Sequence, residues 1–120
     1  MNKLIGVTRW QKDYESARTF QEEEILLRKE LGDRRALADG LERMGGILLE
    51  QDEAGKAVRL WGASHSLREH SDAPLLAAEQ ETLDQGLSQA RSSLGEDRFA
   101  AAWQEGRAMT TEQAIDCALS

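Results

Sequence analysis

The 120-residue chain has only one proline, the strongest helix breaker, and only one cysteine, the residue that cross-links folds. The single cysteine excludes an internal disulfide and gives no reason to expect an oxidising compartment. No apolar run approaches the roughly eighteen residues of a membrane span, and Met1–Trp10 lacks the apolar core of a signal peptide. We therefore expect a cytoplasmic protein with no membrane contact.

Positive charge is also scarce, because 15 Lys and Arg residues face 22 Asp and Glu residues, for a formal net charge of −7. The field of such a chain repels a phosphate backbone, so direct binding of nucleic acid is not expected. The length suits one domain. A hydrophobic content of 40% with a single proline favours helices over strands, and the predicted fold class is all-α.

Residue patterns typical of catalytic or metal-binding sites are missing as well. His65 and His70 fall on different faces of a helix, and no cysteine or paired carboxylate completes a zinc ligand set. His65 and Glu69 instead have the spacing of a surface pair. Cys117 has no activating histidine beside it and is expected to pack half-buried. We expect no catalytic residue, no cofactor and no metal, and therefore a protein that is not an enzyme.

The stretch Leu41–Ser64 organises the chain, because it has the pattern of a helix, a tight turn and a second helix. Small residues at helical spacing let two helices approach closely, while large ones fill the grooves on either side. The small residues are Gly45, Gly46, Ala57, Ala63 and Ser64, and the large ones are Leu41, Met44, Leu48 and Trp61. Asp33 is the expected N-cap of this hairpin, and residues 51–53 its turn.

Before the hairpin we expect a short helix that ends near Lys12 and Asp13, as if its opening turns were missing, and then a helix over residues 14–31. Gly32 would stop this second helix. Its inward side chains are predicted to be Tyr14, Ala17, Phe20, Leu27 and Leu31. Glu22–Glu24 most simply form a solvated face, with an acidic docking surface as the alternative.

After the hairpin, Pro74 marks the clearest break in the chain. A stripe from Leu76 to Leu94 predicts a helix ended by Gly95, with Gly86 as a point of close contact. A short helix over residues 96–105 is expected to stop at Gly106. The Thr110-x-x-Gln113 spacing of a capping box then opens a terminal helix.

Two related units can be aligned at an offset of 40 residues, with Ala17 against Ala57. At these residues, and at Leu41, Met44, Gly45, Leu48 and Trp61, the sequence resembles the tetratricopeptide-repeat superfamily. The resemblance implies a right-handed α-α superhelix. It would divide the single domain into a shortened hairpin over residues 1–32, a second hairpin over 33–72 and a three-helix C-terminal cap over 73–120.

A more particular resemblance covers Leu31–Leu119. This part of the chain looks like the C-terminal helical-repeat end of large bacterial signalling ATPases and transcriptional regulators of LuxR-like and antibiotic-regulatory type. The chain carries neither the phosphate-binding GxxxxGK[ST] pattern nor a recognisable DNA-binding helix pair. The resemblance therefore implies the repeat scaffold alone, without ATPase or DNA-binding activity.

The repeat alignment also suggests an inner groove that would bind a partner. Its predicted residues are Arg9, Trp10, Asp39, Glu42, Leu49 and Glu50, with Gly46 on the same surface. Trp61 and Trp103 are assigned to the core. Glycines stand where the carboxylate-clamp subset of these repeats has asparagines, so binding of an acidic chaperone tail is not expected.

The sequence thus favours a non-catalytic module that binds a protein or peptide, at the sensor or scaffold end of a bacterial regulator. Two alternatives remain open. The first is a capping piece that forms a homodimer through the exposed face of its first hairpin, because solenoids must cover their ends. The second is a small-molecule sensor domain with a pocket between hairpins.

Overall fold

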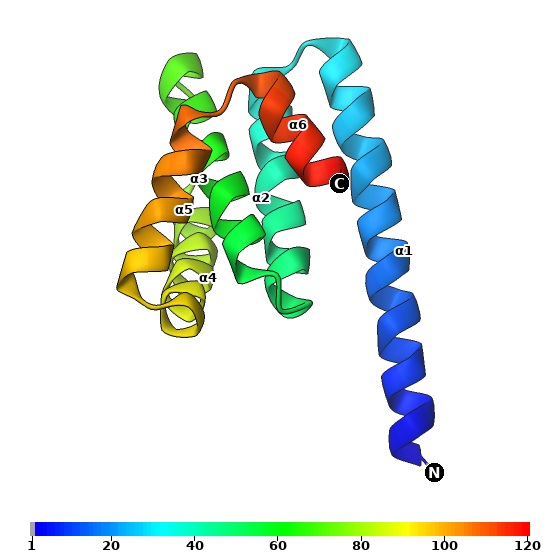
Figure 1. The fold of residues 1–120 in the computed structure, drawn as a ribbon. Coiled ribbons are helices and arrows are strands. Elements are labelled where there is room, and N and C mark those ends of the chain that lie inside the picture. The colour runs from blue at the N-terminus through cyan, green and yellow to red at the C-terminus, as the bar shows by residue number, and fades with distance from the viewer. Residues whose placement is uncertain (1) are drawn as a thin grey trace.

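The computed structural model describes the backbone of residues 2–120 and the side chains of residues 15–120. All regular secondary structure within residues 2–120 is α-helical, which confirms the predicted fold class (Figure 1). The helices are α1 (Asn2–Leu31), α2 (Arg34–Glu50), α3 (Ala54–Ser71), α4 (Ala77–Leu94), α5 (Glu96–Ala108) and α6 (Thr111–Leu119).

The α2–α3 hairpin forms the centre of the molecule, as its sequence predicts. The Asp33 side chain caps α2 by accepting a hydrogen bond from the amide of Ala36 at 3.1 Å. The turn at residues 51–53 places Asp52 in the left-handed region, with φ of 63°. The predicted stripe of α2 is almost fully buried at all four positions, namely Leu37, Leu41, Met44 and Leu48.

Helix α3 is the central element, because α2, α4, α5 and α6 all pack against it. The contact with α5 is close enough that a methyl group on Gly106 would overlap the backbone of Arg59. The predicted stop at Gly106 is wrong, because α5 continues to Ala108. Gly106 lies inside the helix, where its missing side chain allows the two backbones to approach.

The remaining C-terminal boundaries follow the sequence signals. Gly95, with φ of 84°, separates α4 from α5. The capping box at α6 is complete, since Gln113 N donates to Thr110 Oγ1 at 3.1 Å and Thr110 N donates to Gln113 Oε1 at 2.9 Å. Leu76, placed at the start of the α4 stripe, is instead exposed at the cap before the helix.

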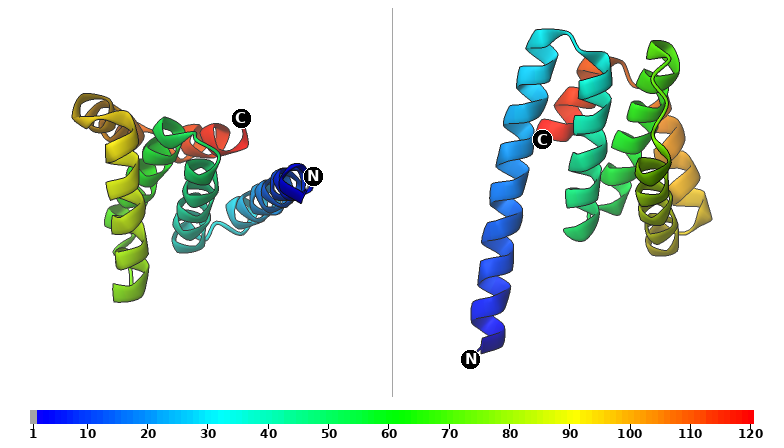
Figure 2. Two further views of the ribbon diagram at one scale, coloured as in Figure 1. Left: turned by 90° about the horizontal axis from the view of Figure 1, so that it is seen from below. Right: turned by 180° about the vertical axis from the view of Figure 1, so that it is seen from behind.

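Helix α1 differs from the prediction, because it runs without interruption from Asn2 to Leu31. The break expected at Lys12 and Asp13 is wrong, and with it the division of residues 1–32 into a hairpin. Neither residue is a strong helix breaker such as proline or glycine. In Figure 2, α1 lies along one side of α2 while α3, α4 and α5 lie on the other.

The inward face predicted for α1 is wrong as well. Phe20, Leu27 and Leu31 are 61%, 52% and 71% exposed, whereas Ile25 is fully buried and Gln21 is 5% exposed. Ala17 is half-buried, and Tyr14 falls outside the residues whose side chains are described. The apolar stripe of α1 therefore faces away from the rest of the molecule.

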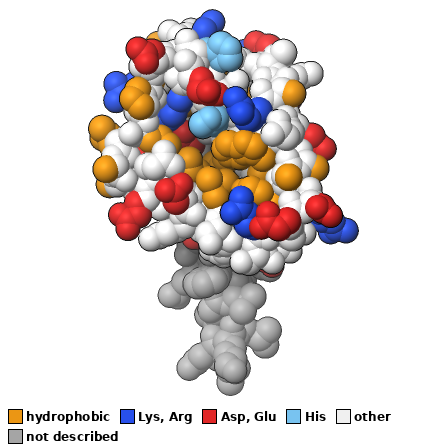
Figure 3. Space-filling view, turned by 90° about the vertical axis from the view of Figure 1, so that its left-hand side faces the viewer, with side chains coloured by type: hydrophobic (Ala, Val, Ile, Leu, Met, Phe, Trp, Pro, Cys, Tyr) orange, Lys and Arg blue, Asp and Glu red, His pale blue; other side chains and the backbone are white. Residues whose placement is uncertain are grey.

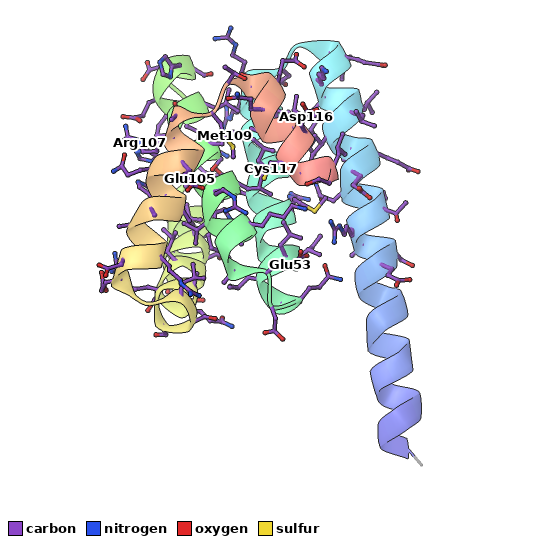
Figure 4. All side chains as sticks on the ribbon, viewed as in Figure 1. Glu53, Glu105, Arg107, Met109, Asp116 and Cys117 are labelled. Carbon is purple, nitrogen blue, oxygen red and sulfur yellow. The ribbon has the colours of Figure 1, made fainter. Side chains whose placement is uncertain are left out.

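Polar contacts hold α1 to the body. Arg18 pairs with Glu53, labelled at the α2–α3 turn in Figure 4, at 3.4 Å and donates to the Ser120 carbonyl at 2.9 Å. Gln21 donates to the carbonyl of Gly40. The described part of this helix is thus attached by hydrogen bonds and ion pairs as well as by the buried Ile25 side chain.

Candidate functional site

A groove of about 500 Å³ lies between α2 and α4, and Trp61 of α3 forms part of its floor. The residues from α2 are Asp39, Glu42, Arg43, Gly46, Leu49 and Glu50, and those from α4 are Glu79, Thr82, Leu83, Gln85, Gly86 and Gln89. The α2 residues run from Asp39 to Glu50, which is eleven steps of about 1.5 Å along the helix, so the groove is about 16 Å long. We refer to this surface as the α2–α4 groove.

The structure brings together every predicted groove residue whose side chain it describes. Asp39, Glu42, Leu49 and Glu50 all line the α2–α4 groove, together with Gly46. Arg9 and Trp10 lie outside the residues whose side chains are described. Sequence reasoning missed the whole α4 wall, where Thr82, Gln85 and Gln89 follow helical spacing but look like ordinary surface residues.

The Trp61 ring fits between α2 and α4 because glycines stand where these helices contact it. A methyl group on Gly45 of α2 would lie 2.8 Å from Trp61 Cε2, and one on Gly86 of α4 would lie 2.9 Å from Cη2. The indole N–H donates to the Glu42 carbonyl at 3.1 Å. The close contact predicted at Gly86 is confirmed. The ring is 3% exposed, as its assignment to the core requires, yet it also lines the groove.

An ion pair fixes the carboxylate of Glu42 under the rim. Arg68 Nε and Nη2 donate to the two Glu42 oxygens at 2.7 and 2.8 Å, and Arg68 Nη1 donates to the Ala73 carbonyl at 3.0 Å. The hydrogen bond to Glu42 raises the pKa of Arg68, with further contributions from the Glu42, Glu79 and Asp39 charges, and outweighs the lowering by burial. Glu42 is therefore already engaged inside the protein.

The rim carries more negative than positive charge. Asp39 accepts from Arg28 of α1 and lies 3.2 Å from Arg43, so it connects α1 to the groove. Glu79 accepts from the amide of Leu76, while Glu50 is exposed. Four carboxylates thus meet three arginines, namely Arg28 of α1, Arg43 at the rim and Arg68 beneath it. The groove offers apolar contact at its floor and attraction for cations at its edge.

The other residues considered for chemistry are spread over separate surfaces. His65 Nε2 lies 3.5 Å from Glu69, as predicted, and its ring lies at a tilt of 49° to the ring of half-buried Trp103, with the two centroids 5.4 Å apart. Figure 3 shows a face of the molecule on which hydrophobic side chains gather beside histidine. No group of three potential metal ligands occurs among the described residues. Cys117 is half-buried, as expected.

Comparison with known proteins adds no relative, because no family model, no curated protein and no solved structure matches the chain. Within the part of the chain that the structure describes, none of the helices has the length and apolar character needed to span a bilayer. The class of protein that the fold defines is an all-helical protein with an open groove between two helices.

Proposed function

We propose that this chain is a non-catalytic interaction module that binds a short segment of a partner protein in the α2–α4 groove. The observation that carries the proposal is the groove itself, with Leu49, Trp61 and Leu83 as apolar contacts and carboxylates along the edge. Its volume lies in the range of about 300–1,000 Å³ that is typical of ligand sites.

The charges and dimensions of the groove define the partner segment. Glu50 and Glu79 favour lysine or arginine side chains, since Asp39 is already paired with Arg28 and Arg43. The floor favours aliphatic side chains. A length of about 16 Å corresponds to about five residues of extended chain at roughly 3.3 Å each. The carboxamides of Gln85 and Gln89 could pair with the peptide groups of such a segment, which would otherwise lose hydrogen bonds to water.

The likeness in sequence to tetratricopeptide repeats, and to the C-terminal end of bacterial regulators, agrees with such a role. It would place the module at the sensor or scaffold end of a signalling or transcription protein, and that placement stays a prediction.

Gly46 provides a sharp test, because a side chain at this position would point into open groove space. We would select from a phage-displayed library of random twelve-residue peptides on the intact chain. Peptides that combine Lys or Arg with Leu, Ile or Phe should be enriched. Gly46→Phe should abolish their binding by filling the groove, while the control Gly46→Ala should leave it nearly unchanged. Enrichment that Gly46→Phe does not reduce, or no enrichment, would contradict the proposal.

A further inference from the structure

The strongest feature outside the groove is the outer face of α1, which we define by Phe20, Leu27 and Leu31. Their separations of seven and four residues place them on one side of the helix. All three are more than half exposed, and no other element covers them. Large apolar side chains that are aligned in this way mark interaction sites more often than scattered ones do.

The helix cannot bury this stripe by turning about its own axis without losing contacts to the body. The opposite side of α1 holds the fully buried Ile25 and the hydrogen bond from Gln21 to Gly40. Arg28 donates to the Ala36 carbonyl at 2.7 Å and to Asp39 at 3.2 Å. These contacts fix the rotation of the helix, so the outer face stays available to another molecule.

The charges that flank the stripe are negative. Glu23 and Glu30 are exposed, and the structure pairs neither of them with a cation among the described residues. An open depression of about 540 Å³ is lined by Glu15, Ser16, Thr19, Phe20 and Glu23. The outer face thus combines apolar side chains with acidic neighbours along about three turns of helix.

This combination selects one kind of occupant. A second copy of the chain would bring the same acidic neighbours to the contact, and both copies would carry a net charge of −7, which opposes their association. A helix with a leucine stripe and flanking lysines or arginines would meet the apolar stripe together with Glu23 and Glu30. We infer that the outer face of α1 docks a basic amphipathic helix of another protein, at a site separate from the α2–α4 groove.

A designed pair of peptides tests this inference on the full chain. The probe is a labelled eighteen-residue peptide with a Leu-Lys-Lys-Leu-Leu-Lys-Leu pattern, and its control has glutamate at every lysine position. Fluorescence anisotropy should show binding of the lysine peptide, weakened by added salt, and no binding of the glutamate peptide.

Variants then locate the contact. The pair Leu27→Ser and Leu31→Ser should weaken binding at least tenfold, as should the pair Glu23→Lys and Glu30→Lys. The matched control pair Glu81→Lys and Asp97→Lys makes the same charge change at exposed positions elsewhere and should weaken it by less than threefold. Circular dichroism should show unchanged helix content, because none of the substituted side chains is buried.

Two results would overturn the inference. Loss of binding in Gly46→Phe would show that the lysine peptide occupies the α2–α4 groove, which would support the proposed function alone. Sedimentation that shows a dimer, abolished by Leu27→Ser and Leu31→Ser, would show that a second copy covers the outer face.

Discussion

Two neighbouring glycines of α2 have opposite surroundings. Gly45 faces the Trp61 ring at a distance that leaves no room for a methyl group, while Gly46 faces open space. Gly45→Ala should lower the free energy of unfolding by about 1–3 kcal/mol through overpacking. Gly46→Ala should raise it by about 0.5–1 kcal/mol, because alanine favours the helix. Urea unfolding of the two variants provides a matched comparison, and effects of the same sign would contradict this description of the groove floor.

The ion pair of Arg68 and Glu42 is the most buried in the described part of the chain, with side chains 8% and 13% exposed. Arg68→Met should lower the free energy of unfolding by about 3–5 kcal/mol, because Glu42 would keep a buried charge without its partner. Adding Glu42→Met should recover much of that loss. Thermal and urea unfolding of the single and double variants would measure the difference.

Lys29→Met is the control for this experiment. Lys29 and Glu112 form a pair at 3.0 Å, but their side chains are 42% and 69% exposed. Removing an exposed pair should change the free energy of unfolding by less than about 1 kcal/mol.

The raised pKa of Arg68 means that its stabilising charge is present below the ordinary pKa of arginine and is lost only as the pH rises through the raised value. The loss in Arg68→Met should therefore be the same at pH 7 and pH 9.

At the scale of elements, the described part of α1 is anchored by little apolar burial. Among its described residues, Ile25 is the only large apolar side chain that is fully buried. We expect the amides of residues 15–31 to exchange hydrogen faster than those of α2 and α3. Ile25→Ala should speed this exchange further and leave the α2–α3 amides protected, while Leu27→Ala should have little effect. Equal protection of α1 and α3 would contradict this picture.

The sequence allows α2 and α3 to be predicted because their strongest apolar stripes are also the buried ones. In α2, Leu37, Leu41, Met44 and Leu48 repeat at helical spacing and pack on α3. In α1 the strongest stripe is Phe20, Leu27 and Leu31, yet the opposite side meets the body. The reason is a set of polar contacts, such as that of Arg28 with the Ala36 carbonyl, that exist only once α2 has folded.

Only one of the two walls of the candidate site could be predicted from the sequence, for a similar reason. The repeat alignment groups Asp39, Glu42 and Glu50 of the α2 wall from sequence, and their helical spacing agrees with one shared face. The α4 wall depends on how α4 docks on Trp61 through Gly86, which is a contact between distant parts of the chain. The ion pair between Arg68 and Glu42 could not be predicted from the sequence either, because the two residues are 26 positions apart.

At the scale of the whole molecule, the net charge of −7 opposes self-association near neutral pH. The sequence pI of about 4.8 means that protonation of carboxylates removes this repulsion in mild acid. With Phe20, Leu27 and Leu31 exposed, we expect a monomer at pH 7.5 and reversible association as the pH approaches 4.8. Static light scattering across this range would check the prediction, and a stable dimer at pH 7.5 would contradict it.

The contact of Trp61 with Gly45 and Gly86 restricts which substitutions these three positions can accept during evolution. The three residues come from three different helices, and each occupies space that the others leave empty. A larger residue at position 45 or 86 is compatible with this packing only if the ring at position 61 becomes smaller. In descendants of this chain that keep the fold, we expect the three positions to change together, so that a pairing of alanine with leucine could replace one of glycine with tryptophan.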